Sequence, residues 1–340
     1  MNHPPADLTG QIREVVLQAL ATGHQHPDLQ RFEGLVRDYP ERRGKTLRGR
    51  LVVLSARAHG GDETAALTAA AGVELFQDWV LIHDDIEDDS EERRGRPALH
   101  RITGAPVAIN VGDALHVMMW RLLMSLPVSS ARGVDREAIL HEFLWMILRT
   151  AEGQHLDLSW ISEGRFDIGE DDYLTMVTLK TAYYTVVCPL RLGAACAGLP
   201  PSPAFESGGI DLGVAFQIRD DVLNLMPQAG TAYGKEYAGD LYEGKRTLIL
   251  THLLAHADVE EVARARDILA RPRGDKSAAD IEWLLDAVRR HGSLAYAQAV
   301  AESRAQRGLA RLSDALEELP ERSAARELRS LLATLTLRTR

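Results

Sequence analysis

The chain contains little cysteine, with only Cys188 and Cys196 in 340 residues. The two lie eight positions apart within an apolar helical pattern, so neither a disulfide framework nor a metal-binding knuckle is indicated. Reduced cysteines packed in a core are typical of the cytoplasm, which is the location that we predict.

The sequence also lacks an excess of positive charge, because its formal net charge at pH 7 is −10. Nonspecific binding to nucleic acid needs a basic face, so the composition argues against nucleic acid as a partner. An anionic substrate would have to be met by local groups of cations.

Long apolar runs are missing as well. No uninterrupted run approaches the length of about 18 residues that marks a membrane helix. The first residues, Met1 to Asp7, show no basic region followed by an apolar one. We therefore predict neither a transmembrane segment nor an export signal.

Clean strand alternation is absent, whereas apolar residues recur with helical spacing, for example over Ile12–Leu20, Leu140–Leu148 and Leu309–Leu316. The chain is therefore predicted to be all-α. Clusters of proline and glycine break the pattern without forming a polar linker long enough to separate domains. We expect a single domain over residues 1–340.

Acidic residues, by contrast, are abundant and concentrated in one place. Seven of the nine residues from Asp84 to Glu92 are acidic, and an apolar helical pattern leads into them. At about 100° per residue, Asp84 and Asp88 lie about 40° apart on a helix, and Asp85 lies within reach of the same point. Converging carboxylates repel one another unless a cation lies among them, and oxygen ligands of this kind suit Mg²⁺. The alternative is a solvated acidic helix end.

The same spacing occurs a second time, at Asp220, Asp221 and Asn224. Two such helices facing each other could hold several Mg²⁺ ions. Mg²⁺ takes few protein carboxylates and leaves its other positions to water and substrate phosphates, so the pair of motifs predicts a di- or triphosphate ligand. This repetition favours metal binding over the solvated helix end.

Basic residues that could complete a phosphate site alternate with the two acidic motifs. Arginine binds phosphate as a planar fork and lysine as a point charge. The candidates are Lys45, Arg48, Arg93, Arg94, Lys180, Lys235 and Lys245.

These motifs resemble those of the trans-type, head-to-tail isoprenyl diphosphate synthases over roughly Gly44 to Leu250. Leu81–Asp88 followed by Arg93–Gly95 resembles the first aspartate-rich motif of that family, and Phe216–Asp221 resembles the second. Further family signatures are matched in order by Ala108–Leu115, Gly153–Gln154, Lys180–Ala182 and Asp240–Lys245.

The resemblance implies an all-α isoprenoid synthase bundle around a central cavity, usually as a homodimer. It also implies a short-chain prenyltransferase that joins isopentenyl diphosphate to an allylic diphosphate with three Mg²⁺ ions. The roles that it assigns are Mg²⁺ binding to Asp84, Asp85, Asp88, Asp220 and Asp221; allylic diphosphate binding to Arg93, Lys180, Lys235 and Lys245; isopentenyl diphosphate binding to Lys45, Arg48, Gln77 and Arg94; and stabilisation of positive charge on the reacting carbons to Thr181 and Gln217.

Four positions depart from the family pattern. Thr46 replaces a common arginine, so the site for isopentenyl diphosphate is less basic than usual, and Gly49 replaces a common proline. Gln77 replaces a histidine and can donate a hydrogen bond but cannot become cationic. Asn224 replaces the last aspartate of the second motif, which should weaken that metal site without removing it.

Product length follows from the residues before the first motif. Val80 and Trp79 lie four and five residues before Asp84, about 6 and 7.5 Å back along a helix axis. An indole that faces the cavity would block further growth of the product, so we expect C15 first and C20 second. The alternative is that Trp79 packs as ordinary core.

Three other functions remain open from the sequence. A class I terpene cyclase shares the fold and first motif, but residues 222–228 lack the terminal glutamate of its second metal motif. A noncatalytic subunit of a prenyl diphosphate synthase often loses motif aspartates, whereas both pairs are intact here. An α-helical scaffold with acidic faces would leave the ordered basic clusters unexplained.

Overall fold

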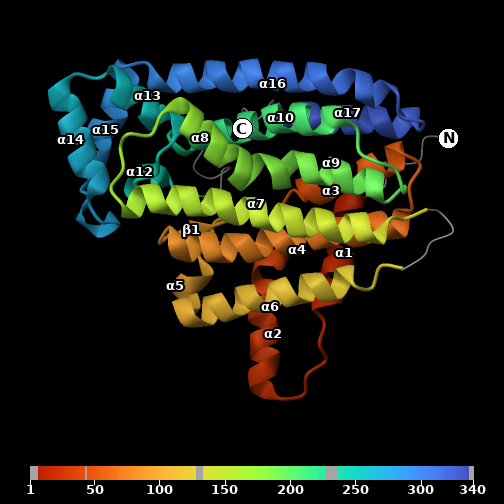
Figure 1. Cartoon of the computed structure of the whole chain (residues 1–340). Helices are drawn as coiled ribbons and strands as arrows, with labels where there is room; N and C mark the ends of the chain where they lie inside the picture. The colour runs from red at the N-terminus through yellow and green to blue at the C-terminus, as the bar shows by residue number, and fades with distance from the viewer. Residues whose placement is uncertain (1–6, 43, 128–132, 227–235, 337–340) are drawn as a thin grey trace.

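The computed structural model of the chain describes residues 7–42, 44–127, 133–226 and 236–336 (Figure 1). It is built almost entirely from helices, which confirms the all-α prediction. In the described residues, strands occur only in a hairpin of β1 (Glu92–Arg93) and antiparallel β2 (Arg96–Pro97). The helices are α1 (Leu8–Leu20), α2 (Pro27–Glu41), α3 (Leu47–Ala58), α4 (Glu63–Glu87), α5 (Leu99–Thr103), α6 (Ala105–Leu123), α7 (Arg136–Ser162), α8 (Glu170–Val177), the π-helix η1 (Thr178–Val187), α9 (Cys188–Ala195), α10 (Pro203–Asn224), α12 (Gly239–Glu243), α13 (Leu248–His256), α14 (Val259–Ala270), the 3₁₀ helix η3 (Arg273–Asp275), α15 (Ala278–Arg290), α16 (Ser293–Glu317) and α17 (Arg322–Thr336).

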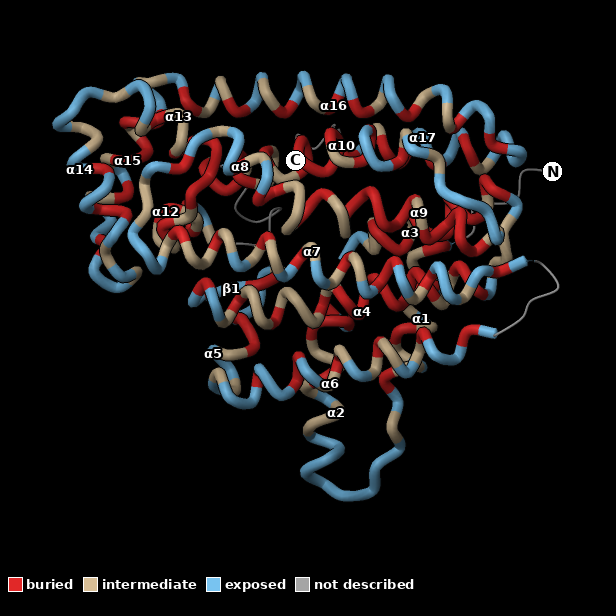
Figure 2. Tube along the Cα trace, viewed as in Figure 1, coloured by how far each residue is buried: buried red, intermediate tan, exposed pale blue. Residues whose placement is uncertain are grey.

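Helix α4 is the central helix of the bundle. Its first turn is capped by Asp62, whose side chain accepts a hydrogen bond from the backbone N–H of Ala65 at 2.9 Å. Buried alanines let α4 pack closely against α3 and α6, and the buried faces of α3, α4 and α9 meet inside the molecule (Figure 2). The helix ends at Glu87, so the first acidic motif occupies its last turn.

The length and mean hydropathy of α4 would also suffice to cross a membrane. Core helices of globular proteins meet the same criterion, and 61% of the most apolar window of α4 is buried inside the structure. The composition of this helix is therefore that of a central core helix.

The π-helix η1 lies between α7 and α10, and glycines allow the close approach on both sides. A Cβ at Gly153 of α7 would collide with the backbone of Lys180, and one at Gly213 of α10 would collide with Ala182. Long π-helical segments are rare and occur mostly at functional sites. The packing fixes the position of the segment that carries Lys180 and Thr181.

Buried apolar residues form two clusters, and α10 contributes to both. Phe216 belongs to the cluster built around α3, α4 and α6, whereas Ile218 belongs to the cluster built around α13, α15 and α16. A helix shared in this way fits a single domain over residues 1–340, and that domain assignment stays a prediction. Cys188 and Cys196 are buried free thiols.

Candidate active site

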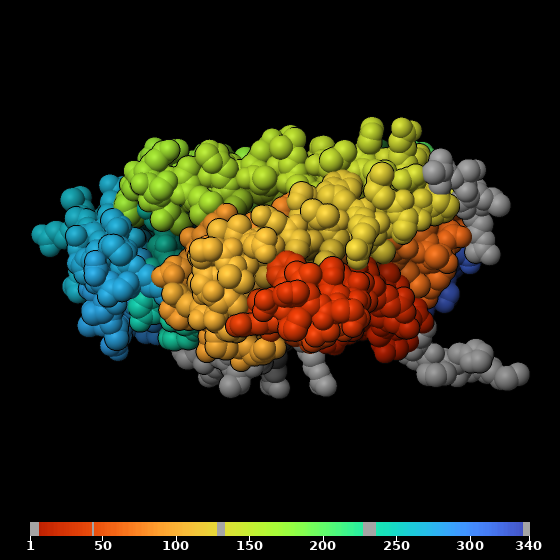
Figure 3. Space-filling view, turned by 90° about the horizontal axis from the view of Figure 1, so that it is seen from below, coloured from red at the N-terminus to blue at the C-terminus, as the bar shows by residue number. Residues whose placement is uncertain are grey.

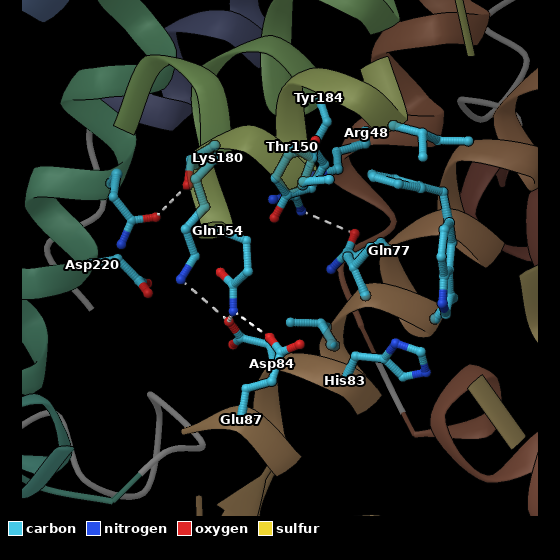
Figure 4. A pocket seen from close by; sticks show the side chains of 18 of the residues that line it. Arg48, Gln77, His83, Asp84, Glu87, Thr150, Gln154, Lys180, Tyr184 and Asp220 are labelled. Atoms are coloured by element: carbon cyan, nitrogen blue, oxygen red, sulfur yellow. Dashed lines mark hydrogen bonds and ion pairs between the residues drawn. The ribbon is translucent and has the colours of Figure 1, made fainter. Parts of the chain in front are cut away.

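A cavity of about 380 Å³ lies between α4, α7, η1 and α10 (Figure 4). On α4 the polar and apolar lining residues are separated along the helix, since Asp84 follows Phe76 by eight residues, or about 12 Å along the axis. We call one part the charged end, formed by Asp84, Glu87, Arg93, Gln154, Lys180, Asp220 and Lys245, and the other the apolar end, formed by Phe76, Trp79, Val80, Ile147 and Tyr184.

Asp84 projects into the charged end (Figure 4). One carboxylate oxygen lies 3.3 Å from Nζ of Lys180 and accepts a hydrogen bond from Gln154 at 3.4 Å. The other lies 3.4 Å from the guanidinium of Arg93. Three different elements, β1, α7 and η1, therefore bring donors to one carboxylate.

Asp85 is placed differently from the prediction that it converges with Asp84 and Asp88. It is fully buried and lies outside the cavity lining, where it accepts hydrogen bonds from the hydroxyl of Tyr39 and from Nε of Arg93 at 2.9 Å. This interaction fixes the guanidinium that reaches Asp84. In this structure Asp85 therefore positions Arg93.

The β1–β2 hairpin explains how Arg93 returns to the end of α4. Its two turn residues, Arg94 and Gly95, have φ of 55° and 72°, and two positive φ values are typical of the tight type I′ turn. Gly95 adopts this conformation without strain. The turn directs the side chain of Arg93 to Asp84 and Asp85.

Asp88 caps the end of α4 and is buried against Lys245, with 2.6 Å between its carboxylate and Nζ. Burial raises the pKa of Asp88 to about 7, although Lys245 opposes the shift. Lys245 also pairs with Glu243 at 3.0 Å and borders the cavity, whereas Asp88 lies behind it. Burial alone would lower the pKa of Lys245, but the surrounding carboxylates outweigh it and raise that pKa.

The second acidic motif divides into three environments. Asp220 borders the cavity from α10, opposite Asp84 (Figure 4). Asp221 is buried and accepts hydrogen bonds from the Tyr173 hydroxyl at 2.7 Å and from Gln217 at 2.8 Å. Burial raises its pKa to about 6. Asn224 was predicted to turn its amide oxygen to a common point with the two aspartates, but that oxygen accepts the backbone N–H of Asp240 at 3.1 Å. Its role here is to hold the first turn of α12.

Lys180 and Thr181 both reach the cavity from η1. Besides Asp84, Lys180 donates to Asp157 at 2.6 Å. Burial alone would lower the pKa of Lys180, but Asp157 and Asp84 raise it above its ordinary value. Thr181 donates to Gln217 at 3.0 Å, and Gln217 donates to Asp221. The two predicted charge-stabilising residues are therefore joined in one hydrogen-bonded chain.

The residues predicted to bind isopentenyl diphosphate are brought together only in part. Arg48 and Gln77 border the cavity, and Arg48 donates to the Gln77 amide oxygen and to Thr185, each at 2.9 Å. Its guanidinium also lies over the ring of Tyr184, 4.3 Å from the centroid. Lys45 is exposed and lies outside the cavity lining.

Arg94 borders the cavity as well and pairs with the buried Asp78 at 3.1 Å. It also donates to the backbone oxygen of Tyr39 at 2.8 Å. Lys235, predicted to bind the allylic diphosphate, lies outside the described residues.

Both residues predicted to set product length line the apolar end. Trp79 borders the cavity beside Val80, and its ring meets Phe76 edge to face at 5.7 Å. Phe76 in turn meets Tyr184 at 5.6 Å. The indole is thus part of an aromatic wall.

The lining fits Mg²⁺ in donor type. Asp84 and Asp220 present hard oxygen donors to one cavity from two helices. In the part of the chain that the structure describes, no three His, Cys, Asp or Glu side chains gather closely enough to hold a metal by themselves. Mg²⁺ needs only one or two carboxylates when substrate phosphates supply further oxygens, so the arrangement suits a metal bound together with a diphosphate.

Several functional contacts were missed from the sequence. Glu87, which was not among the predicted site residues, is exposed but borders the cavity and accepts a hydrogen bond from Gln154. Asp157 holds Lys180 from the same face of α7 as Gln154, three residues earlier, and this spacing makes it a candidate from the sequence as well. Tyr39 and Tyr173 each hold the second aspartate of a motif, and no local pattern indicates either.

The chain is similar to prenyl synthases in sequence and in structure. The polyprenyl synthetase family model matches residues 30–288. A short chain isoprenyl diphosphate synthase of Methanothermobacter thermautotrophicus is 34% identical over 299 residues, 86% of each chain, and a geranylfarnesyl diphosphate synthase of Natronomonas pharaonis is 31% identical over 353 aligned positions, 96% of each. The crystal structure of geranylgeranyl pyrophosphate synthase from Corynebacterium glutamicum complexed with isoprenyl diphosphate and magnesium has a TM-score of 0.85 at 26% identity, covering 99% of this chain and 100% of that one.

Proposed function

The chain belongs to the polyprenyl synthetase family, and from this premise we propose that it joins isopentenyl diphosphate to an allylic diphosphate to make a C20 prenyl diphosphate. Membership makes the protein a trans-prenyltransferase of a Mg²⁺-dependent family. The choice of substrates, the use of three Mg²⁺ ions and the product length are the proposed parts.

One observation carries the proposal. Asp84 of α4 and Asp220 of α10 border the same cavity, and Lys180, Lys245 and Arg93 lie at the same end. Cations and carboxylates placed together in this way can bind a diphosphate directly and through a metal.

In the proposed reaction, the C–O bond of the allylic diphosphate breaks and the diphosphate leaves with the electron pair. Asp84 and Asp220 would hold Mg²⁺, which when bound would supply a Lewis acid for the leaving diphosphate, whereas Asp88 would act by holding Lys245. Lys180, Lys245 and Arg93 would hold its oxygens and offset the negative charge that develops there. Asp85 and Asp221 would act by holding Arg93 and Gln217.

The positive charge left on the allylic carbon is met by dipoles. The Thr181 hydroxyl oxygen and the Gln217 amide lie at the cavity in one hydrogen-bonded chain, which can stabilise a cation without carrying charge. The double bond of isopentenyl diphosphate forms the new C–C bond with that carbon, and a proton passes to the released diphosphate. Arg48, Gln77 and Arg94 would hold the acceptor diphosphate, with Lys45 outside the cavity wall.

Product length is the point where the proposal differs from the sequence prediction of C15 first. The relatives and neighbours include proteins named for C20 and C25 products, and these names favour C20 for this chain. Trp79 lines the apolar end, which supports a limit to chain growth.

We also propose that the enzyme is a homodimer. Large apolar side chains are exposed on α6 and α7, which share the face seen in Figure 3, and exposed apolar residues on neighbouring elements often mark a protein interface. They include Val107, Ile109, Val117, Leu144 and Leu148. Sedimentation of Leu144→Asp should give a monomer where the parent chain gives a dimer, and a monomeric parent would refute the proposal.

The activity is tested by incubating the purified protein with isopentenyl diphosphate, Mg²⁺ and C5, C10 or C15 allylic diphosphates. The proposal expects prenyl diphosphates with C20 as the main product. A hydrocarbon or terpene alcohol would identify a cyclase instead. Turnover only after a partner synthase is added would identify a noncatalytic subunit.

A further inference from the structure

The aromatic wall at the apolar end continues behind the cavity into α6. The ring of Trp79 stacks face to face on the imidazole of His116, with 4.1 Å between centroids and 14° between planes. His116 does not border the cavity, so this contact is on the side of Trp79 away from the substrate. Stacking of two flat rings restricts rotation of the indole about its side-chain bonds.

His116 is itself held by Trp120, one turn further along α6. Nε1 of Trp120 donates to Nε2 of His116 at 2.9 Å. An indole N–H can only donate, so Nε2 must accept and the imidazole is neutral in this arrangement. Burial lowers the pKa of His116, which agrees with a neutral ring. The hydrogen bond fixes the plane of the imidazole and with it the plane of the indole stacked on it.

Helices α4 and α6 are close enough for this contact because of Gly112. A Cβ at Gly112 would collide with the imidazole of His83, and His83 meets Trp79 edge to face at 6.1 Å. Gly112, His116 and Trp120 are spaced by four residues and therefore lie along one face of α6. That face packs against the α4 residues that line the cavity.

We propose that His116 and Trp120 are positioning residues for product length, acting through Trp79 without touching the substrate. Together they hold the indole across the apolar end. Without the imidazole, the indole can rotate into the space left behind it, and the cavity deepens. This inference rests on the proposed prenyl transfer and concerns product length alone.

The test is the product distribution of four variants made from isopentenyl diphosphate and a C15 allylic diphosphate. For His116→Ala we expect the ratio of C25 to C20 product to rise about two- to tenfold, the range that corresponds to one aromatic pair. His116→Phe keeps a flat ring under the indole but cannot accept the hydrogen bond from Trp120, so it should raise the ratio less than His116→Ala does. Trp120→Phe removes only the N–H donor and should raise the ratio less than His116→Ala does. Trp79→Ala, which removes the wall, should raise it most.

Two controls separate positioning from general loss of stability. His59→Ala removes a buried imidazole that packs edge to face on Phe205 elsewhere in the bundle, and Trp283→Phe changes a half-buried indole of α15. Both should keep the parent product ratio, even where thermal unfolding shows lower stability.

The outcomes distinguish the inference from the proposed function. If Trp79→Ala lengthens the product and His116→Ala leaves it unchanged, the positioning role is refuted while prenyl transfer stands. If no variant changes the product, Trp79 is not the limit to growth and the inference fails with it. If the parent protein forms no prenyl diphosphate, the proposed function itself fails.

Discussion

The two ends of the cavity depend on different kinds of contact. At the charged end, Lys180, Lys245 and Arg93 each pair with specific carboxylates, with the lysine contacts at 2.6–3.3 Å, and the charge and position of single atoms decide the interaction. At the apolar end, the ring centroid of Phe76 lies 5.7 Å from that of Trp79 and 5.6 Å from that of Tyr184, and the shape of the packed rings sets the space for the substrate. Changes at the charged end should therefore alter rate, and changes at the apolar end should alter product length.

The largest loss is expected from Asp84→Asn. The amide keeps the shape but removes a charge that faces Lys180 and Arg93, so kcat should fall about 10²- to 10³-fold, as it does when one preorganised electrostatic group is lost. The residual product should have the parent length. Asp89→Asn is the matched control, because Asp89 is exposed and pairs with Arg101 outside the cavity. If Asp84→Asn kept the rate of the parent enzyme, the charged end would have no part in the reaction.

Gly153→Ala tests whether the charged end depends on exact placement. The added Cβ would collide with the backbone of Lys180 and shift its ammonium group, which should lower kcat about 10- to 100-fold. Gly34 of α2 has no atom within 4 Å of the corresponding Cβ, so Gly34→Ala should keep full activity. Equal activity of the two variants, measured at saturating substrate, would contradict the expectation.

Gln77→Leu should weaken the binding of isopentenyl diphosphate. It removes the amide oxygen that accepts from Arg48 at 2.9 Å, a hydrogen bond to a charged group, so the KM for isopentenyl diphosphate should rise about tenfold. The KM for the allylic diphosphate and the product length should stay the same. A rise confined to the allylic KM would mean that Arg48 serves the other substrate.

Val80→Phe should have the smallest effect on rate and a clear effect on product. A larger side chain at the apolar end shortens the space for the growing chain, so C15 should replace C20 as the main product while turnover stays within about threefold. The control is Val259→Phe, because Val259 is 86% exposed at the start of α14. An unchanged product length would show that the chain grows in another direction.

Much of this arrangement could be predicted from the sequence, because helical periodicity and repeated acidic motifs are local patterns. Helical periodicity predicted the all-α fold and the repeated motif paired Asp84 with Asp220, whereas the family resemblance assigned Lys180 and Lys245 to the same site. The environments of Asp85 and Asn224 could not be predicted in this way. Asp85 is turned inward by Tyr39, 46 residues earlier, and Asn224 is held by the backbone of Asp240, so both depend on tertiary contacts.

Two further features could not be predicted from the sequence either. The β1–β2 hairpin has strands of two residues, too short for any alternation to show. The stack of Trp79 on His116 requires α4 and α6 to pack at one particular register. Sequence patterns indicate which residues share a face of one helix, but they do not indicate which faces meet.

The division of the cavity into a charged end and an apolar end is tested most directly by a crystal structure with Mg²⁺ and an unreactive allylic thiodiphosphate. We expect the diphosphate at Lys180, Lys245 and Arg93, with Mg²⁺ bridging it to Asp84 and Asp220 and the hydrocarbon tail directed toward Trp79. A diphosphate bound away from Asp84 and Asp220, or a tail directed away from Trp79, would contradict the account.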